Sequence, residues 1–474
     1  MTQKPVITPS QFFKYAVSPH WIWYDLNGDP SKKGEVPEFT QKLIEEGVLH
    51  EENYVKDLKF DAIPENLSEK NKLKETLQLM KSGADLIYQG MIETDAGTAI
   101  YRGQPDLLEK RPGKSNFGDY FYTPIEIKNS TKCEKAEYRF QLTFYAFILE
   151  KLQGLFPAEG GFINKKQVRL VYPFKEKDKV ATLERADTIL QIINGKEPPL
   201  KITSISKSSP WFDELLKTAK EKNDISLIYK LDSRAIENLK EIDIKTVADM
   251  AGVDVDSLPK ISYAGPETLA RAKEQAKSLL GNKVIPLSKP AIPDAKVKIY
   301  FDIEGDPFLK VEYLFGFWIA EEGEEPYFKY FIAEQPEDEE KMWHEFLEWV
   351  NVLPYDDYRV YHYADYERQK LIKLSENYGG SDQLNAFIGK LVDLAKIVQE
   401  SVILPLYFYS IKDIAKSPFL GYKWRHEKAG GAQSIFWYEK WLEAGDKSVL
   451  QDIINYNEDD VVATEFLHEW LLRL

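Results

Sequence analysis

Apolar residues recur along the first part of the chain with two different spacings. Residues 40–56 place Leu43, Ile44, Val48, Tyr54 and Val55 at helical intervals. The same interval predicts helices over 10–15, with Thr8 or Ser10 as the N-cap, and over 138–152 and 184–193. Shorter apolar runs between turn residues predict strands at 85–93, 99–108, 121–128 and 166–172. Residues 1–222 are therefore expected to form a mixed α/β domain.

The pattern of apolar and polar residues changes twice in the remainder of the chain. Residues 223–283 have Leu, Ile and Ala at helical spacing and no strand pattern, which predicts a small all-α connector. Residues 284–296 carry Pro286, Pro290 and Pro293 among small polar residues, which predicts a linker. From residue 297 strands are expected at 297–302, 313–320 and 359–363, with helices at 339–350, 365–374 and 449–472. We therefore expect an α/β multidomain protein whose last domain spans 297–474.

Composition narrows the class of protein. A chain of 474 residues exceeds one ordinary core, and 43% hydrophobic with 29% charged residues fits a soluble globular protein. No apolar run of about 18 residues predicts a membrane span, and the polar start lacks the pattern of a signal peptide. The single cysteine, Cys133, excludes an internal disulfide framework and a four-cysteine iron–sulfur cluster or zinc site within one chain. A cytoplasmic protein is the expectation.

The formal net charge of −15 argues against a broadly basic surface for nucleic acid. It does not exclude a metal-dependent nuclease, because such an enzyme needs acidic residues to hold its cations. Basic residues also cluster locally, as at 164–169.

Asp302 and Glu304 flank Ile303 and form a D-x-E motif at the end of an apolar strand. Residues two apart in a strand share a face, so both carboxylates point the same way. That arrangement is costly unless a cation neutralises it. Downstream, Tyr456 and Asp460 are four apart and share one face of a predicted helix. Taken alone, each pair is also compatible with a solvated strand end or a wet helix.

In this order, the two motifs resemble the first and last motifs of DnaQ-like, RNase H-fold 3′–5′ exonucleases of the DEDDy subtype. The resemblance covers residues 297–474 and implies Mg²⁺ or Mn²⁺ at a two-metal site formed by Asp302, Glu304, a middle acid and Asp460, with Tyr456 catalytic. The middle motif here is Tyr366-Glu367 where Phe-Asp is expected. Glu367 would be the middle ligand, with Asp365 as the rival. Val392-Asp393-Leu394 and Ser410-Ile411-Lys412 resemble the subgroup fused to RecB-like nucleases.

A second set lies in the N-terminal region. Asp106 follows Gly103-Gln104-Pro105, and Glu126 and Lys128 share one face at the end of the next predicted strand. Two carboxylates can bind a divalent ion while the lysine orients water or balances phosphate charge. E-x-K alone is weak, since these residues are common at strand edges.

With its neighbours, this set resembles the RecB-like branch of PD-(D/E)XK nucleases over residues 1–222. The resemblance implies a restriction-endonuclease-like α/β fold, with His50, Asp106 and Glu126 as metal ligands and Lys128 catalytic. Gln141 and Tyr145, four apart on the next helix, would support it. Taken alone, His50 is an ordinary surface or core histidine. Many relatives carry four cysteines for an iron–sulfur cluster, and this chain has Ser18, Ser206 and Ser209 in the corresponding segments.

Residues 231–280 look like helix-hairpin-helix modules, which grip nucleic-acid backbone, although no clear Gly-x-Gly stands in the hairpins. A plain helical spacer is an equal alternative. The aromatic cluster at 21–24 could stack bases, but core packing is the simpler expectation.

The sequence thus predicts a metal-dependent nuclease that hydrolyses phosphodiester bonds of DNA, from single-stranded ends, with two candidate active sites. The alternatives are an RNA exonuclease, a nucleic-acid-binding scaffold with one degenerate nuclease domain, and a hydrolase of a small nucleotide. A helicase or repair partner is compatible with this prediction but is not indicated by any motif. Neither cleavage polarity nor oligomeric state follows from the sequence.

Overall fold

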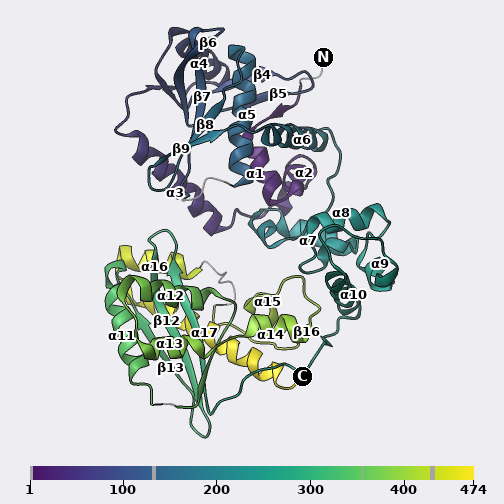
Figure 1. The fold of residues 1–474 in the computed structure, drawn as a ribbon, viewed down its shortest axis with the longest axis vertical. Helices are drawn as coiled ribbons and strands as arrows, with labels where there is room; N and C mark the ends of the chain where they lie inside the picture. The colour runs from purple at the N-terminus through teal and green to yellow at the C-terminus, as the bar shows by residue number, and fades with distance from the viewer. Residues whose placement is uncertain (1–3, 131–134, 355, 427–432) are drawn as a thin grey trace. The chain divides into compact units, whose positions relative to one another are not determined.

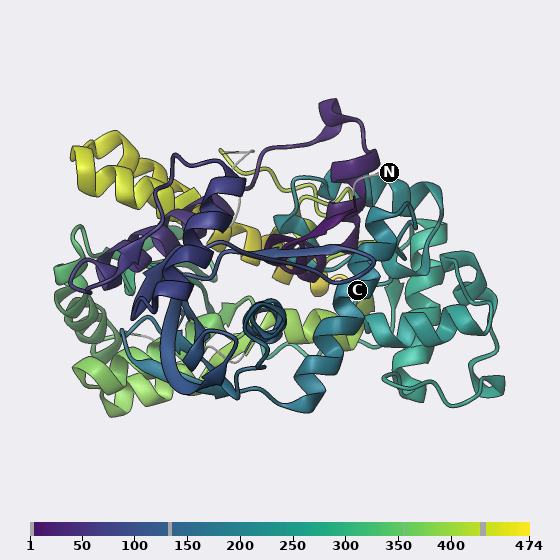
Figure 2. The same ribbon diagram turned by 90° about the horizontal axis from the view of Figure 1, so that it is seen from above.

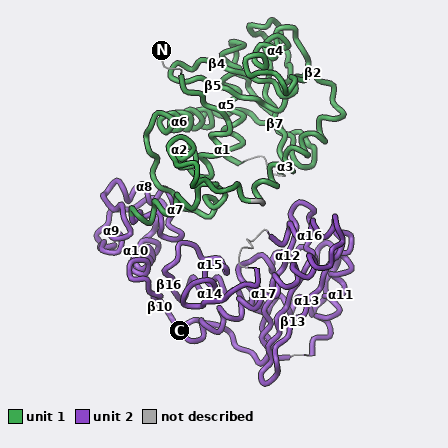
Figure 3. The backbone as a smooth tube through the Cα atoms, turned by 180° about the vertical axis from the view of Figure 1, so that it is seen from behind, with its two compact units in different colours: residues 1–222 green, residues 223–474 purple. Residues whose placement is uncertain are grey.

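The computed structural model describes residues 4–130, 135–354, 356–426 and 433–474. The chain divides into two compact units, Met1–Lys222 and Asn223–Leu474, shown in different colours in Figure 3. Figures 1 and 2 follow the same chain from its purple N-terminus to its yellow C-terminus. Within the described residues, no helix combines the length and the apolar character that a membrane crossing requires.

Two β-sheets form the scaffold of the first unit. The larger sheet has the order β2–β3–β6–β7–β8–β9, with the bounds Asp61–Ala62, Leu86–Tyr88, Leu107–Ser115, Gly118–Ile127, Glu159–Ile163 and Arg169–Pro173. The smaller has the order β1–β5–β4, with the bounds Val6–Ile7, Ile100–Gly103 and Ile92–Asp95. In the β6–β7 hairpin Leu107 pairs with Ile125. The residues just before β6 and at the end of β7 therefore meet at one end of the sheet.

The helices of this unit are α1 to α7, with the bounds Pro9–Val17, Pro19–Asn27, Glu38–Val55, Glu69–Ser82, Ala136–Gln153, Glu176–Ile193 and Phe212–Glu221. Short 3₁₀ turns lie at Pro30–Lys32 and Ser204–Ser208. Helix α5 packs against β7, α1 and α6 because its apolar face, including Phe144 and Ile148, is fully buried. It ends at Gly154, whose φ of 71° is readily adopted without a Cβ.

Two predicted strands are each divided in the structure. The run 85–93 becomes β3 and β4, because Gln89 turns the chain with a φ of 55°. The run 99–108 becomes β5 and β6, separated at Pro105, which has no N–H for the ladder. The N-cap of α1 is Thr8, whose capping box with Gln11 starts the helix one residue earlier than expected. Trp21 and Tyr24 are buried in α2.

The second unit begins with short helices. They are α8 to α10, with the bounds Ser233–Glu241, Val247–Gly252 and Pro266–Gly281, and 3₁₀ turns at Ile225–Leu227 and Val255–Ser257. The segment expected as a linker is partly structured, since β10, Ile285–Pro286, pairs antiparallel with β16, Val402–Ile403. Gln275 of α10 donates to the carbonyl oxygens of Leu404 and Leu406 at 2.8 and 3.0 Å. Its neighbour Tyr409 stacks on Tyr229. The helical segment is thus packed onto the domain that follows it.

A five-stranded sheet forms the rest of this unit, in the order β13–β12–β11–β14–β15, with the bounds Tyr327–Ile332, Val311–Glu321, Val297–Asp306, Tyr358–His362 and Leu391–Asp393. The first three strands are antiparallel, and β14 and β15 join in parallel. The helices are α11 to α17, with the bounds Glu339–Asn351, Tyr366–Tyr378, Asp382–Gly389, Leu394–Ser401, Ile411–Ala415, Gln433–Ala444 and Lys447–Leu471. A 3₁₀ turn at Pro336–Asp338 leads into α11.

The two faces of this sheet carry different cores. Alternate residues of β11, Ile299 and Phe301, are buried with α11, whereas Tyr300 packs with Val461 and Leu467 of α17. Strand alternation therefore places Asp302 and Glu304 on the face that α17 covers. Parallel pairing with β14 ends at Tyr300, so both carboxylates lie past the end of that neighbouring strand.

Candidate functional site

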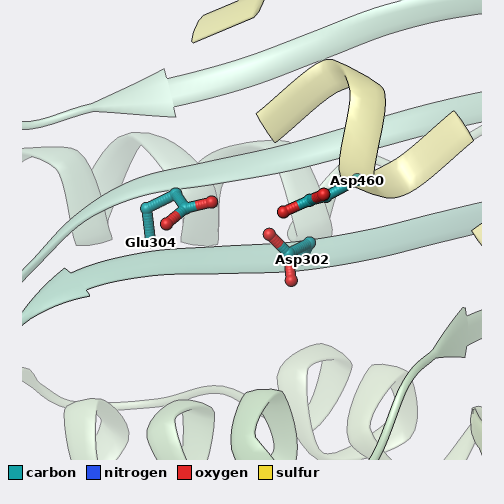
Figure 4. Close-up of side chains that lie close together, drawn as sticks. All are labelled: Asp302, Glu304 and Asp460. Carbon is teal, nitrogen blue, oxygen red and sulfur yellow. The ribbon is translucent and has the colours of Figure 1, made fainter. Parts of the chain in front are cut away.

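Three carboxylates meet where β11 passes beneath α17. One oxygen from each of Asp302, Glu304 and Asp460 lies within 4.8 Å of the other two. Figure 4 shows the two strand side chains and the helix side chain directed toward one another. Glu304 is buried, and Asp302 and Asp460 are half-buried. Acids this close and this sheltered repel one another unless a cation lies between them.

The pKa values of the three acids reflect that repulsion. Burial, reinforced by the charge of Asp460, raises the pKa of Glu304 to about 7. Burial and the charge of Glu304 hold the pKa of Asp302 well above its usual range. Burial also raises the pKa of Asp460, against the opposing effects of Lys412 and of a hydrogen bond from Trp424. The cluster therefore favours any ligand that brings positive charge.

Several polar side chains hold the three acids in place. Asn457 Nδ2 donates to Asp302 Oδ2 at 2.8 Å, and Ser434 Oγ donates to Glu304 Oε2 at 2.5 Å. Trp424 Nε1 donates to Asp460 Oδ1 at 2.5 Å. None of these three was a candidate in the sequence analysis. Only Asn457 left a signal, since it stands between Tyr456 and Asp460 in their shared motif.

Asn457 also explains a glycine in the neighbouring strand. Gly316 of β12 is paired with Asp302. A Cβ at position 316 would overlap Asn457 Oδ1. Asn457 itself is fully buried. The amide thus occupies the space that any side chain at 316 would fill.

Tyr456 lies on the same face of α17 as Asp460. Its side chain is almost fully buried, and its hydroxyl oxygen accepts a hydrogen bond from Lys412 Nζ of α15. That ammonium lies 3.9 Å from Asp460 Oδ2. Burial, followed by the charge of Asp460, raises the pKa of Tyr456, so the hydroxyl stays protonated. Lys412 is thus a cation in contact with the site, which the sequence reasoning noted only as part of a motif.

The two rivals for the middle acid face different surroundings. Glu367 is buried in the first turn of α12, and its Oε2 lies 3.3 Å from His362 Nδ1. Its charge contributes to the raised pKa of Asp302, after burial, Glu304 and Asp460. Asp365 is exposed and accepts a hydrogen bond from Gln369 Nε2 at 2.8 Å. Glu367 is thus the one that turns inward, although it lies outside the group of three whose oxygens converge.

The N-terminal set gathers at the end of the β6–β7 hairpin. Asp106 Oδ2 accepts from the backbone N–H of Ile127 at 2.6 Å, and Lys128 Nζ donates to Glu126 Oε2 at 2.5 Å. Burial and the charge of Glu126 hold the pKa of Asp106 well above its usual range. Although burial opposes it, the charges of Glu126 and Asp106 raise the pKa of Lys128, which stays protonated. The structure therefore brings these three residues together.

His50 and its neighbour Glu51 sit on α3 in the same unit. His50 Nε2 is buried and has no hydrogen-bond partner among the described residues, and the same is true of Glu126 Oε1. His50, Asp106 and Glu126 do not converge as the C-terminal acids do, within the part of the chain that the structure describes. Glu51 is an electrostatic neighbour of Glu126. Burial, with the charge of Glu126, raises the pKa of Glu51. Sequence reasoning missed Glu51, which stands beside His50 in the same motif.

Gln141 and Tyr145 lie together on α5. Gln141 Nε2 donates to the Tyr145 hydroxyl oxygen at 3.0 Å, and that hydroxyl donates to the carbonyl oxygen of Gln104 at 3.2 Å. Lys128, Gln141 and Tyr145 line one cavity. The pair therefore joins the helix to the segment that leads into Asp106.

The donor sets of both clusters suit hard divalent cations. Carboxylate oxygens are the ligands that Mg²⁺ and Mn²⁺ prefer. At the C-terminal cluster the fit rests on three converging acids whose pKa values are raised. A divalent cation would relieve the repulsion that these acids experience.

The C-terminal α/β domain, with its acids on the central strand, was compared with known protein families. Residues 299–472 match the family model of the RNase H superfamily. This domain indicates a nuclease-type function on nucleic acid, and RNase H-like folds typically use divalent metals. No curated protein matches the chain.

Proposed function

We propose that this protein is a divalent-metal-dependent nuclease that hydrolyses phosphodiester bonds of DNA, starting from single-stranded ends. The observation that carries the proposal is the convergence of Asp302, Glu304 and Asp460 within 4.8 Å in an RNase H-like domain. A buried acidic cluster of this kind has little structural use, because its members destabilise one another unless a cation is bound.

Asp302, Glu304 and Asp460 would hold Mg²⁺ or Mn²⁺, with Glu367 as a fourth carboxylate in a DEDDy-type arrangement. When bound, such cations would supply the charge that activates water and stabilises the oxygens of an in-line displacement. The protonated hydroxyl of Tyr456 would orient the attacking water. The water oxygen would form a bond to phosphorus while the bond from phosphorus to the bridging oxygen breaks; the attacking water would lose a proton to solvent, and the leaving oxygen would gain one from solvent. Lys412 balances negative charge beside Tyr456 and Asp460.

A second active site of the RecB-like type is supported by the contacts at the end of the β6–β7 hairpin. Asp106 and Glu126 would hold a divalent cation, assisted by His50 or Glu51 from α3. Lys128, held at 2.5 Å from Glu126, would orient water or the scissile phosphate. The unpartnered oxygen of the fully buried Glu126 favours this proposal, because a buried carboxylate oxygen is costly without a partner.

The test is cleavage of end-labelled single strands in Mg²⁺ and in Mn²⁺, with Asp302→Ala and Asp106→Ala made separately. Labels on the 5′ and the 3′ end report polarity, and a matched RNA strand reports sugar preference. Glu322→Ala, at an exposed position following β12, is the control. We expect Asp302→Ala and Asp106→Ala each to lose the part of the cleavage that its own site performs, while the control retains all of it.

Each other outcome selects a rival. A wild-type protein that cuts nothing in either metal overturns the enzyme and leaves a nucleic-acid-binding scaffold. Loss of activity in only one of the two variants identifies the other domain as structural or regulatory. Preference for the RNA strand makes the protein an RNA exonuclease, and turnover of free nucleotides alone makes it a small-molecule hydrolase.

A further inference from the structure

Strand β12 carries a buried carboxylate that lies outside the group of three converging acids. Glu312 is 4% exposed and stands near the start of this strand, where it pairs with Gly305 of β11. Its carboxylate accepts hydrogen bonds from two side chains of α12. The Tyr366 hydroxyl donates to Oε2 at 2.9 Å, and Lys370 Nζ donates to Oε1. The buried charge is therefore paired, and both of its partners belong to one helix.

The same carboxylate packs against β11 immediately after the acidic motif. A Cβ at position 305 would overlap Glu312 Oε2 and would lie 3.1 Å from the Tyr366 hydroxyl oxygen. The pairing of β11 with β12 also shifts register between Glu304 and Gly305. A glycine at 305 thus lets the Glu312 carboxylate and the Tyr366 hydroxyl lie directly beside the residue that follows Glu304.

The helix that Glu312 holds is the one that carries Glu367. Tyr366 and Glu367 are consecutive in the first turn of α12, and Lys370 lies one turn further on. Lys370 Nζ is 4.8 Å from the centre of the Tyr366 ring, so the two partners share one face of the helix. Burial and the charge of Glu312, followed by the charge of Glu304, raise the pKa of Tyr366. Its hydroxyl therefore stays protonated and remains a donor.

A second bond between a tyrosine and a buried carboxylate holds the other end of α12. The hydroxyl of Tyr378 donates to Oε2 of Glu339, a buried residue of α11, at 2.6 Å. Tyr366 and Tyr378 are the first and last residues of α12. The bond of Tyr366 joins the helix to β12 beside Gly305, whereas the bond of Tyr378 joins it to α11. The two bonds are alike in chemistry and differ in which element they reach.

We propose that Glu312 is a positioning residue that sets the separation between Glu304 and Glu367. Its carboxylate packs against the residue after Glu304 and holds the residue before Glu367. Partners that orient metal ligands without touching the metal commonly control its affinity. The inference rests on the proposed function, in which Glu367 is a fourth carboxylate, and adds a residue that acts only through its neighbours.

The experiment measures the binding of Mn²⁺ alone to the full chain, by electron paramagnetic resonance of the free ion. The parent protein is Asp106→Ala, so that the N-terminal candidate site does not contribute, and the same chain with Asp302→Ala gives the background. We expect Glu312→Gln, made in this parent, to weaken Mn²⁺ binding about tenfold. Thermal melting in EDTA reports the stability of each variant, which separates loss of metal affinity from loss of folding.

Tyr366→Phe separates positioning from simple electrostatics. Glu312→Gln removes a negative charge near the cluster, and that loss by itself disfavours a cation. Tyr366→Phe removes only the hydroxyl and changes no charge, so weaker Mn²⁺ binding in this variant reports the bond itself. Tyr366 is 42% exposed, so this variant is expected to fold and carries the test even where Glu312→Gln does not. Tyr378→Phe, the matched control at the other end of the helix, should bind Mn²⁺ like the parent.

The remaining outcomes count against the inference. Mn²⁺ affinity in Tyr366→Phe equal to that of the parent overturns it, because Glu312 then acts through its charge or serves stability alone. A loss of affinity that Tyr378→Phe shares overturns it as well, since any loosening of α12 would then suffice. A parent that binds no Mn²⁺ above the background overturns the proposed function and this inference with it. The parent titration therefore distinguishes failure of the proposed function from failure of the inference alone.

Discussion

The side-chain amide of Asn457 donates a hydrogen bond of 2.8 Å to Asp302 Oδ2, from a helix that lies 155 residues further along the chain. This bond fixes one carboxylate of the cluster by means of the helix that supplies another, Asp460. Asn457 is fully buried, so the packing of its neighbours sets the orientation of its side chain.

Loss of this amide should impair the site without removing a carboxylate. We expect Asn457→Ala to lower the rate of metal-dependent cleavage about 10- to 100-fold, as loss of partners that orient metal ligands commonly does. Gly316→Ala should act in the same direction, because its Cβ would displace the amide. Asn455→Ala, on the outer side of the same helix, is the control. Equal activity of Asn457→Ala and Asn455→Ala would show that Asp302 needs no such support.

The raised pKa of Glu304, about 7 against its ordinary 4.5, predicts opposite pH trends with and without metal. Between these two values the folded state holds more protons than the unfolded state, so in EDTA the free energy of unfolding falls as pH rises. A divalent cation binds the ionised carboxylates of the folded state, so its affinity and its stabilising effect should grow over the same window. Melting temperatures in EDTA and in Mn²⁺ across this window measure both trends. Glu304→Gln should flatten the EDTA trend; a slope that persists in that variant would assign it to another group.

Glu367 and Asp365 can be separated by paired substitutions. Because Glu367 is buried and its charge is felt by Asp302, we expect Glu367→Gln to reduce cleavage by at least about tenfold. Asp365→Asn should retain activity, since this side chain is exposed and bonds Gln369. Cleavage rates and Mn²⁺ titrations of both variants decide the matter, and the reverse pattern would make Asp365 the middle ligand.

Gln275 should contribute to the stability of the second unit. Its amide donates to two backbone carbonyls and accepts a hydrogen bond of 2.8 Å from the Tyr409 hydroxyl. Gln275→Ala leaves these buried groups without their partner, at about 1–3 kcal/mol for each group that finds no other. Urea unfolding measures the loss. Lys277→Ala, which removes an exposed pair with Glu274 on the same helix, should change stability by less than about 1 kcal/mol. Similar values for the two variants would mean that the helical segment is not fixed through Gln275.

Local geometry made part of the site predictable. The pairing of Asp302 with Glu304 follows from the two-residue alternation of a strand, and that of Tyr456 with Asp460 from the helical interval. The same reasoning located Glu126 and Lys128 at the end of β7. The same reasoning did not predict that the run 85–93 is divided into two strands, because the turn at Gln89 depends on a backbone conformation that no apolar pattern encodes.

The sequence by itself determined the spacing of the acids, the mixed α/β character of the chain and the carboxylate-rich chemistry of its candidate metal sites. Only the tertiary structure decided which acids meet: Asp460 with Asp302 and Glu304, Glu367 inward and Asp365 outward, and Glu51 near Glu126. It also showed that β10, which lies within the expected linker, pairs with β16. The physical reason is the separation along the sequence over which each effect acts. Backbone geometry fixes relations between residues a few positions apart, whereas contacts across 155 residues arise from how strands and helices pack, which local periodicity does not specify.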